Sequence, residues 1–158
     1  MSPAELTAEI RELGRRFPDS RSATIPALRL VQEANGGWLT PESFEQVGSA
    51  LGLTPAYCQA VASFYDMFHL EPVGRHMVEV CTNLSCALVG AQRVVDSFEE
   101  ALGIKAGETT EDGEITFRAV ECLGGCGYAP VVTVDNRYRQ HVSPEDAAAI
   151  VEELRATA

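Results

Sequence analysis

The stretch Val78-Glu79-Val80-Cys81-Thr82-Asn83-Leu84-Ser85-Cys86 decides how the second half of the chain folds. Residues 76–80 are predicted to form a strand, because they make a short apolar run that is rich in valine. A second cysteine pair, in Cys122-Leu123-Gly124-Gly125-Cys126, follows another predicted strand at residues 115–120. The carboxyl ends of neighbouring parallel strands lie side by side at one edge of a sheet, where ligands usually bind. We therefore expect the two cysteine pairs to converge at that edge.

The elements around these strands predict a small α/β sandwich. Residues 84–102 have the apolar spacing of one long helix that ends at Gly103. Two further strands are expected at residues 131–134 and 138–142, separated by the turn residues Asp135-Asn136. A last helix opens at Ser143-Pro144-Glu145-Asp146. The order strand, helix, strand, strand, strand, helix predicts a sheet covered by two helices.

The first half of the chain is predicted to be helical. Ser2-Pro3-Ala4-Glu5 is a capping box, and Thr40-Pro41 and Thr54-Pro55 are also typical helix starts. The fourth predicted helix extends to Phe68. Each of the four helices has one apolar stripe, so they must pack together to be stable. With a boundary at Glu71-Pro72-Val73-Gly74, we expect an α+β protein with an N-terminal helical bundle at residues 1–72 and an α/β domain at residues 73–158.

Composition narrows the function classes. The chain has 158 residues, 46% of them hydrophobic, and it contains no apolar run long enough to span a membrane. The net charge of −11, without a basic stripe, argues against nucleic acid as a partner. The N-terminus lacks the pattern of a secretion signal, so we expect a cytoplasmic protein whose thiols stay reduced. Five cysteines also do not make a complete disulfide framework.

Four of the cysteines have the number and pairing of a metal-ligand set. Cys81, Cys86, Cys122 and Cys126 would supply the four thiolates of one [2Fe–2S] cluster. Structural zinc, a thiol–disulfide catalyst and four free buried thiols are the alternatives, although the tight C-x-x-C spacing of the first two is absent. A [4Fe–4S] ferredoxin packs its cysteines more closely. A Rieske centre needs two histidines, and those of this chain lie outside the cysteine loops, at His69, His76 and His141.

Residues near the cysteines favour a metal group. Cys86 is expected close to the N-terminus of the helix at residues 84–102, where the helix dipole favours a thiolate. Three glycines would let the backbone approach the group and direct N–H groups to its sulfurs: Gly124, Gly125 and Gly127. Three apolar side chains would cover it: Leu84, Leu123 and Ala129.

Several other residues have less specific interpretations. Cys58 lies within the fourth predicted helix and is expected to be a buried core thiol. Phe64, Tyr65 and Phe68 form an aromatic stripe, which predicts core packing, with contact to a partner as the alternative. Trp38 fits either the core of the bundle or a partner surface. The peptide bond before Pro130 is expected to be trans, because most X–Pro bonds are.

The pattern C-x4-C followed at a distance by C-x3-C resembles that of the thioredoxin-like [2Fe–2S] ferredoxins. This family includes the iron–sulfur subunit of bacterial NADH:quinone oxidoreductase (complex I). The resemblance covers nearly the whole chain, and four stretches contain it: Gly36–Leu39, Val61–Tyr65, Val80–Cys86 and Glu121–Pro130. It implies that the domain at residues 73–158 is thioredoxin-like, and that Cys81, Cys86, Cys122 and Cys126 bind one [2Fe–2S] cluster.

The resemblance also implies a function. The chain would be an electron-transfer subunit that exchanges single electrons with the FMN of an NADH-oxidising partner, the F subunit, in the peripheral arm of complex I. It would be part of an enzyme without a catalytic residue of its own, cytoplasmic and held at the inner face of the plasma membrane. FMN and NADH are expected only in the partner. The alternatives are the same module in an NAD-linked hydrogenase or formate dehydrogenase, a zinc-stabilised binding module without redox function, and a free-standing ferredoxin.

Overall fold

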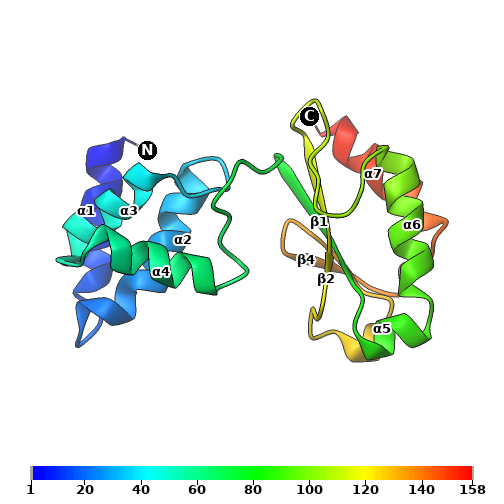
Figure 1. Cartoon of the computed structure of the whole chain (residues 1–158), viewed down its shortest axis with the longest axis horizontal. Coiled ribbons are helices and arrows are strands. Elements are labelled where there is room, and N and C mark those ends of the chain that lie inside the picture. The colour runs from blue at the N-terminus through cyan, green and yellow to red at the C-terminus, as the bar shows by residue number, and fades with distance from the viewer. Residues whose placement is uncertain (1, 158) are drawn as a thin grey trace. The chain divides into compact units, whose positions relative to one another are not determined.

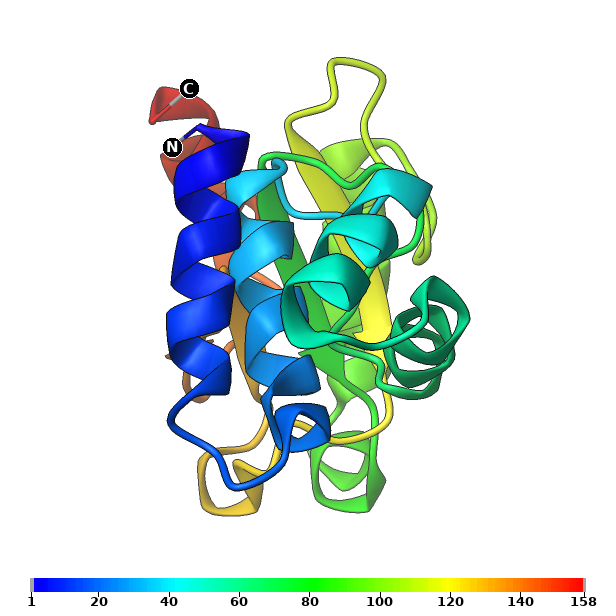
Figure 2. The same cartoon turned by 90° about the vertical axis from the view of Figure 1, so that its left-hand side faces the viewer.

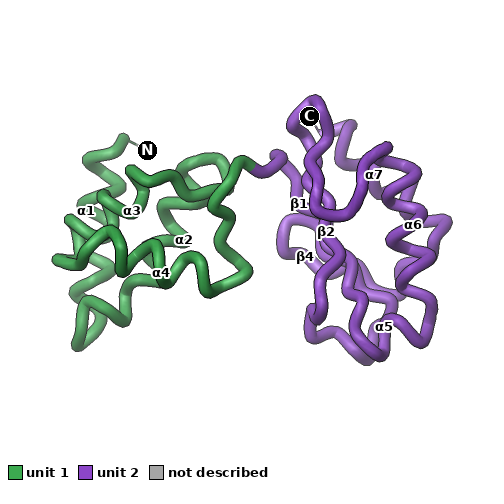
Figure 3. The backbone as a smooth tube through the Cα atoms, in the orientation of Figure 1, with its two compact units in different colours: residues 1–72 green, residues 73–158 purple. Residues whose placement is uncertain are grey.

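The structure, a computed structural model, describes residues 2–157. The chain divides between Pro72 and Val73 into two compact units (Figure 3). Each unit has its own buried core. The core of the first unit is drawn from residues between Leu6 and Phe68, and the core of the second from residues between Val78 and Leu154. Among residues 2–157 no helix combines the length and apolar character that crossing a membrane requires.

The first unit is a bundle of four α-helices with one short 3-10 helix. In chain order these are α1 (Pro3–Gly14), η1 (Ser20–Ala23), α2 (Thr24–Ala34), α3 (Pro41–Leu51) and α4 (Pro55–Phe64). Figure 2 shows α1 and α2 side by side. The predicted starts are confirmed, because the side chains of Ser2, Thr40 and Thr54 accept hydrogen bonds from the first turns of their helices. Cys58 is fully buried, as predicted, and this burial raises the pKa of its thiol.

Helix α4 ends earlier than the sequence predicts, which changes the environment of the aromatic stripe. After Phe64 the chain leaves the helix, and Gln32 of α2 fixes the following loop: its amide donates to the Met67 carbonyl at 3.0 Å and accepts from the His69 N–H at 2.9 Å. Phe68 is buried, but Phe64 is 80% exposed and Tyr65 is 38% exposed. The prediction of core packing was therefore wrong for Phe64 and Tyr65, because it assumed a continuous helix.

The second unit contains a mixed four-stranded sheet with the order β2-β1-β3-β4. Its strands are β1 (His76–Cys81), β2 (Ile115–Val120), β3 (Val132–Val134) and β4 (Arg137–Arg139). Strands β1 and β2 are parallel, whereas β3 is antiparallel to both β1 and β4. The unpaired edge of β2 is partly covered by residues 107–110, where the Gly107 N–H donates to the Phe117 carbonyl at 2.7 Å. Helices plus this sheet confirm the predicted α+β class.

Helices α6 (Ala91–Leu102) and α7 (Asp146–Ala156) pack on one face of the sheet (Figure 1). Phe98 of α6 and Phe117 of β2 are both fully buried, and their rings stack with centroids 5.6 Å apart. The prediction of a single helix at residues 84–102 was wrong. This segment forms two helices, α5 (Leu84–Leu88) and α6, because Gly90 adopts a left-handed conformation with φ of 96°.

Two smaller expectations in this unit were also wrong. The fourth strand covers only Arg137–Arg139, because the chain turns away at His141, which has a φ of 53°. The bond between Ala129 and Pro130 is cis rather than trans. The prediction of a trans bond used only the average preference of X–Pro bonds, which takes no account of the tertiary contacts of a particular loop.

Candidate metal centre

Cys81 is the last residue of β1 and is buried. Its backbone N–H donates to the Val131 carbonyl at 3.0 Å, and its Sγ lies 3.7 Å from the Glu121 carbonyl oxygen. The parallel register pairs Cys81 with Val120, just before the second cysteine pair. The adjoining strand ends predicted from the sequence are therefore present, and they bring the two cysteine loops to one edge of the sheet.

Cys86 lies in the short helix α5 and is also buried. Asn83 begins this helix, and its side chain accepts from the Leu84 N–H at 2.7 Å. Because α5 has one turn and is separated from α6, the dipole of a long helix does not act on Cys86 as the sequence suggested. Burial instead dominates the environment of this thiol.

Burial raises the pKa of the Cys86 thiol, because an ionised sulfur loses solvation in apolar surroundings. A hydrogen bond with the Val131 backbone opposes this effect. The hydrogen bond with Cys81 and the charges of Cys81 and Cys126 raise the pKa further. These interactions show that three of the four predicted ligands, Cys81, Cys86 and Cys126, lie near one another.

Cys122 and Cys126 lie on the loop that follows β2, and both are exposed. Cys126 opens the short helix η2 (Cys126–Tyr128). Figures 1 and 2 show this loop and α5 at the same end of the second unit. The cysteine pairs thus differ in environment: the pair from β1 and α5 is covered, and the pair after β2 faces solvent.

Two glycines of this loop have distinct roles. Gly124 has a φ of 75°, which a side chain would strain, and its N–H lies 3.4 Å from the Cys122 Sγ. A Cβ on Gly125 would come within 3.0 Å of the Val131 side chain, so this glycine permits close packing of the loop on the sheet. At Gly127 a Cβ would meet nothing within 4 Å, and the structure gives no reason for that glycine.

The apolar surroundings fit a metal group held by thiolates. Ala91 and Val131 are buried with Cys81 and Cys86, and Leu123 and Ala129 pack against this small buried group. Leu84, the third predicted cover residue, is 70% exposed instead. Thiolates are the donors that iron–sulfur clusters and structural zinc share, so the donor type fits both.

No three His, Cys, Asp or Glu side chains in the part of the chain from residue 2 to residue 157 are arranged to hold a single metal ion. A two-iron cluster has a different requirement, because its four cysteines are divided between two irons. One cysteine pair on each of two adjoining loops provides that number and type of donor.

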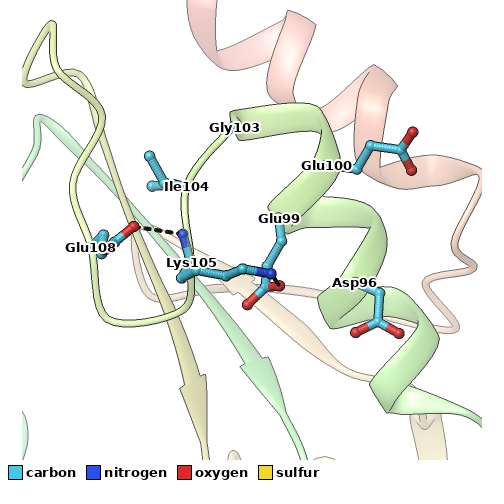
Figure 4. A pocket seen from close by; sticks show the side chains of 7 residues that line it. All are labelled: Asp96, Glu99, Glu100, Gly103, Ile104, Lys105 and Glu108. Carbon is cyan, nitrogen blue, oxygen red and sulfur yellow. Dashed lines mark hydrogen bonds and ion pairs between the residues drawn. The ribbon is translucent and has the colours of Figure 1, made fainter.

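A separate acidic hollow lies at the end of α6, and none of its lining residues is a cysteine (Figure 4). It has a volume of about 380 Å³ and is lined by Asp96, Glu99, Glu100, Gly103, Ile104, Lys105 and Glu108. Lys105 pairs with two of its acidic residues: its ammonium lies 2.6 Å from Glu99, and its backbone N–H lies 2.7 Å from Glu108. The hollow is thus a structural feature of the turn after α6.

One residue of the site was missed by sequence reasoning. Tyr138, on β4, donates a hydrogen bond from its hydroxyl to the Leu123 carbonyl in the cysteine loop. These two residues are 15 positions apart, and no periodicity or motif links them. The contact arises only when the sheet places β4 beside that loop.

Comparison with known proteins shows a matching family and a similar fold. The sequence matches the family described as "Thioredoxin-like [2Fe-2S] ferredoxin" over residues 10–155. The fold is similar to a solved chain of NAD+-reducing [NiFe]-hydrogenase in the air-oxidized state, with a TM-score of 0.72. That match covers 82% of this chain and 23% of the hydrogenase chain at 21% identity, so it concerns the fold alone.

Three relatives share the sequence more closely, and all are subunits of NADH-quinone oxidoreductase. The E subunit from Mycobacterium tuberculosis is 42% identical, covering 97% of this chain and 60% of the relative. The E 2 subunit from Rhizobium meliloti is 40% identical, covering 94% and 88%. The subunit numbered 2 from Thermus thermophilus is 42% identical, covering 93% and 82%. The chain thus spans about 60% of the length of the mycobacterial relatives it matches.

Proposed function

Because this chain belongs to the thioredoxin-like [2Fe–2S] ferredoxin family, we propose that it is an iron–sulfur electron-transfer subunit of an NADH:quinone oxidoreductase. Family membership supports a [2Fe–2S] cluster as its cofactor. The observation that supports the site most strongly is the parallel register of β1 and β2, which brings the loops of Cys81 and Cys122 to one sheet edge. We assign Cys81, Cys86, Cys122 and Cys126 as the four ligands.

The chain's own residues would hold, cover and orient the cofactor. A [2Fe–2S] cluster supplies one-electron transfer when bound. Cys81 and Cys86 would bind it from the covered side, where Val131 and Ala91 exclude water. Cys122 and Cys126 would bind it from the solvent side. No general base or nucleophile is required, because the protein makes and breaks no covalent bond of a substrate.

The assembly is also part of the proposal. The relatives from Mycobacterium, Rhizobium and Thermus are named as subunits of NADH-quinone oxidoreductase, which supports partner subunits in one complex. We propose that the direct partner is the F subunit, a flavoprotein that would hold FMN and NADH and lie with other subunits in the peripheral arm. The complex would place this chain in the cytoplasm, at the inner face of the plasma membrane.

Exposed apolar side chains beside the cysteines support a partner at this end of the second unit. Leu88 of α5 is 78% exposed, and Leu84 and Val89 are also exposed. Apolar patches of this kind often mark protein contacts. A partner seated here would approach the site directly, as one-electron transfer over a short distance requires.

Anaerobic purification of the full chain tests the cofactor. We expect two irons and two sulfides per chain, visible absorption, and an EPR signal that develops on reduction. One zinc per chain without sulfide would instead indicate a zinc-stabilised binding module without redox function. A preparation without iron, made under argon from iron-replete cells, would overturn the proposal.

Co-purification identifies the assembly. A tag on this chain should retain a flavoprotein together with other subunits of a quinone oxidoreductase. Recovery of hydrogenase or formate dehydrogenase subunits would assign the same electron-transfer role to another NAD-linked complex. Recovery of the iron–sulfur chain without a flavoprotein under conditions that preserve complexes would favour a free-standing ferredoxin.

A further inference from the structure

The peptide group between Leu123 and Gly124 is hydrogen-bonded at both of its ends. Its N–H, on Gly124, lies 3.4 Å from the Cys122 Sγ. Its carbonyl, on Leu123, accepts a hydrogen bond from the Tyr138 hydroxyl. The N–H and C=O of a planar trans peptide point in opposite directions. The bond that holds the carbonyl outward therefore also holds the N–H toward the sulfur.

The sheet determines the position of Tyr138. Strand β4 pairs with β3, and the register places Tyr138 opposite Thr133. The Tyr138 ring lies along the cysteine loop, where its Cε1 is 3.7 Å from the position that a Cβ on Gly125 would occupy. Gly124 has a φ of 75°, a conformation that glycine accepts without strain and that orients this peptide group. The ring is 55% exposed, so its hydroxyl can be altered without opening the core.

We infer that Tyr138 is a positioning residue that tunes the reduction potential of the proposed [2Fe–2S] cluster through the Leu123–Gly124 peptide. The inference rests on the proposed function. Hydrogen bonds to cluster sulfurs are among the terms that set the potential, because they stabilise the extra negative charge of the reduced state. A hydrogen bond to the carbonyl polarises the amide and makes its N–H a stronger donor. The hydrogen bonds that link the Tyr138 hydroxyl, the Leu123–Gly124 peptide and the Cys122 sulfur therefore raise the reduction potential.

The variant Tyr138→Phe removes the hydroxyl and keeps the ring. Since the amide loses polarisation and orientation, the equilibrium constant for reduction should fall about threefold, the scale of a modest net hydrogen bond. At 59 mV per tenfold change for a one-electron couple, this corresponds to a midpoint about 30 mV more negative. The measurement is an EPR-monitored redox titration of the anaerobically purified full chain, with iron content determined on the same sample.

Tyr128→Phe is the matched control. Tyr128 is 51% exposed, it follows the same loop, and its hydroxyl has no hydrogen bond within the described part of the chain. Its ring and the His141 ring are in an edge-to-face arrangement, with centroids 6.0 Å apart. Removal of this hydroxyl should leave the midpoint unchanged. A merely structural role of Tyr138 would lower iron retention without moving the midpoint of the iron that remains.

A second variant decides the question if Tyr138→Phe does not retain its iron. Fluorotyrosine at position 138 keeps the ring and the hydroxyl but makes the hydroxyl a stronger donor. The midpoint should then move in the opposite direction, to a more positive potential. An unchanged midpoint in fluorotyrosine protein, or in iron-loaded Tyr138→Phe, would overturn the inference and leave the proposed function intact. A wild-type chain without a cluster would overturn both.

Discussion

The five cysteines of this chain share one side-chain chemistry but have three different environments. Cys58 is enclosed in the helical bundle, Cys81 and Cys86 are covered at the end of the sheet, and Cys122 and Cys126 are exposed on a loop. Burial raises the pKa of both the Cys58 and the Cys86 thiol. Of these two residues, Cys86 lies beside Cys81 and Cys126, whereas Cys58 lies in the core of the bundle. Neighbouring thiols, rather than burial, therefore distinguish the proposed ligand from the core residue.

Replacement of single cysteines by serine tests that separation. Cys122→Ser should lose most of its iron, because a hydroxyl is a much poorer ligand for an iron–sulfur cluster than a thiolate. Cys58→Ser is the control, and it should keep the iron of the wild type. It should be destabilised by about 1–3 kcal/mol, because it places a hydroxyl in a fully buried site. Iron and sulfide analysis reports the first effect and urea unfolding the second; equal iron loss in the two variants would contradict the ligand assignment.

The cysteines were predictable from sequence because their spacing and their positions after two strands are local features. The exposure of Phe64 and the contact of Tyr138 with Leu123 were not. Both depend on residues distant in the chain: Gln32 fixes the loop after Phe64, and the β3–β4 pairing delivers Tyr138. Residue spacing therefore identified the proposed ligands but not these contacts between residues distant in the chain.

At the scale of elements, helix starts were predicted better than helix ends. Threonine or serine followed by proline fixes a start within four residues, as at Thr40 and Thr54. The end of α4 and the break between α5 and α6 depend on tertiary contacts and on the backbone of one glycine. Parallel pairing of β1 and β2 was predictable because a helix connects them in sequence, whereas the length of the short edge strand β4 was not.

The break between α5 and α6 at Gly90 can be tested by substitution. Gly90→Ala should destabilise the second unit by about 1–2 kcal/mol, because a residue with a Cβ is strained at a φ of 96°. The added Cβ would also approach the Arg93 guanidinium at 2.9 Å, although that side chain can move. Urea unfolding followed by circular dichroism measures the effect. Gly127→Ala, where a Cβ meets nothing within 4 Å, is the control, and equal stability of the two variants would argue against the left-handed break.

The turn after α6 should respond to acid. Hydrogen bonds from the Lys105 ammonium and the Ala106 N–H lower the pKa of Glu99 below its ordinary value of 4.5. These hydrogen bonds require the ionised Glu99 carboxylate. Their contribution to the stability of the turn is therefore complete above pH 4.5 and is lost as the pH falls through the lowered pKa. Glu99→Ala should speed hydrogen exchange of the Ala106 amide at neutral pH, as measured by NMR. Glu100→Ala, on the same helix, is the control and should leave the exchange rate of this amide unchanged. If Glu99→Ala also left the exchange rate unchanged, the hydrogen bond from Ala106 to Glu99 would not stabilise the turn.

At the scale of the whole molecule, the proposed metal site lies entirely in one of the two units. All four proposed ligands, their apolar cover and Tyr138 lie in the second unit. The first unit supplies a closed helical core centred on residues such as Ile10, Leu28 and Val47, and it contributes no proposed ligand. Its exposed Phe64, Tyr65, Met67 and Leu70 follow one another around the end of α4. The proposed cluster site and the helical bundle thus lie in separate parts of the chain.

This separation predicts that residues 73–158 fold and load a cluster without the bundle. A domain with its own core is able to fold alone, and among the described residues the hydrophobic core of this unit runs from Val78 to Leu154. The fragment purified anaerobically should show the circular dichroism of a mixed helix–sheet protein and the same iron per chain as the full-length protein. Residues 1–72, expressed separately, should be helical and free of iron, since Cys58 is their only cysteine. A 73–158 fragment that is unfolded, or folded but colourless beside a brown full-length preparation, would mean that the bundle is required to build the site.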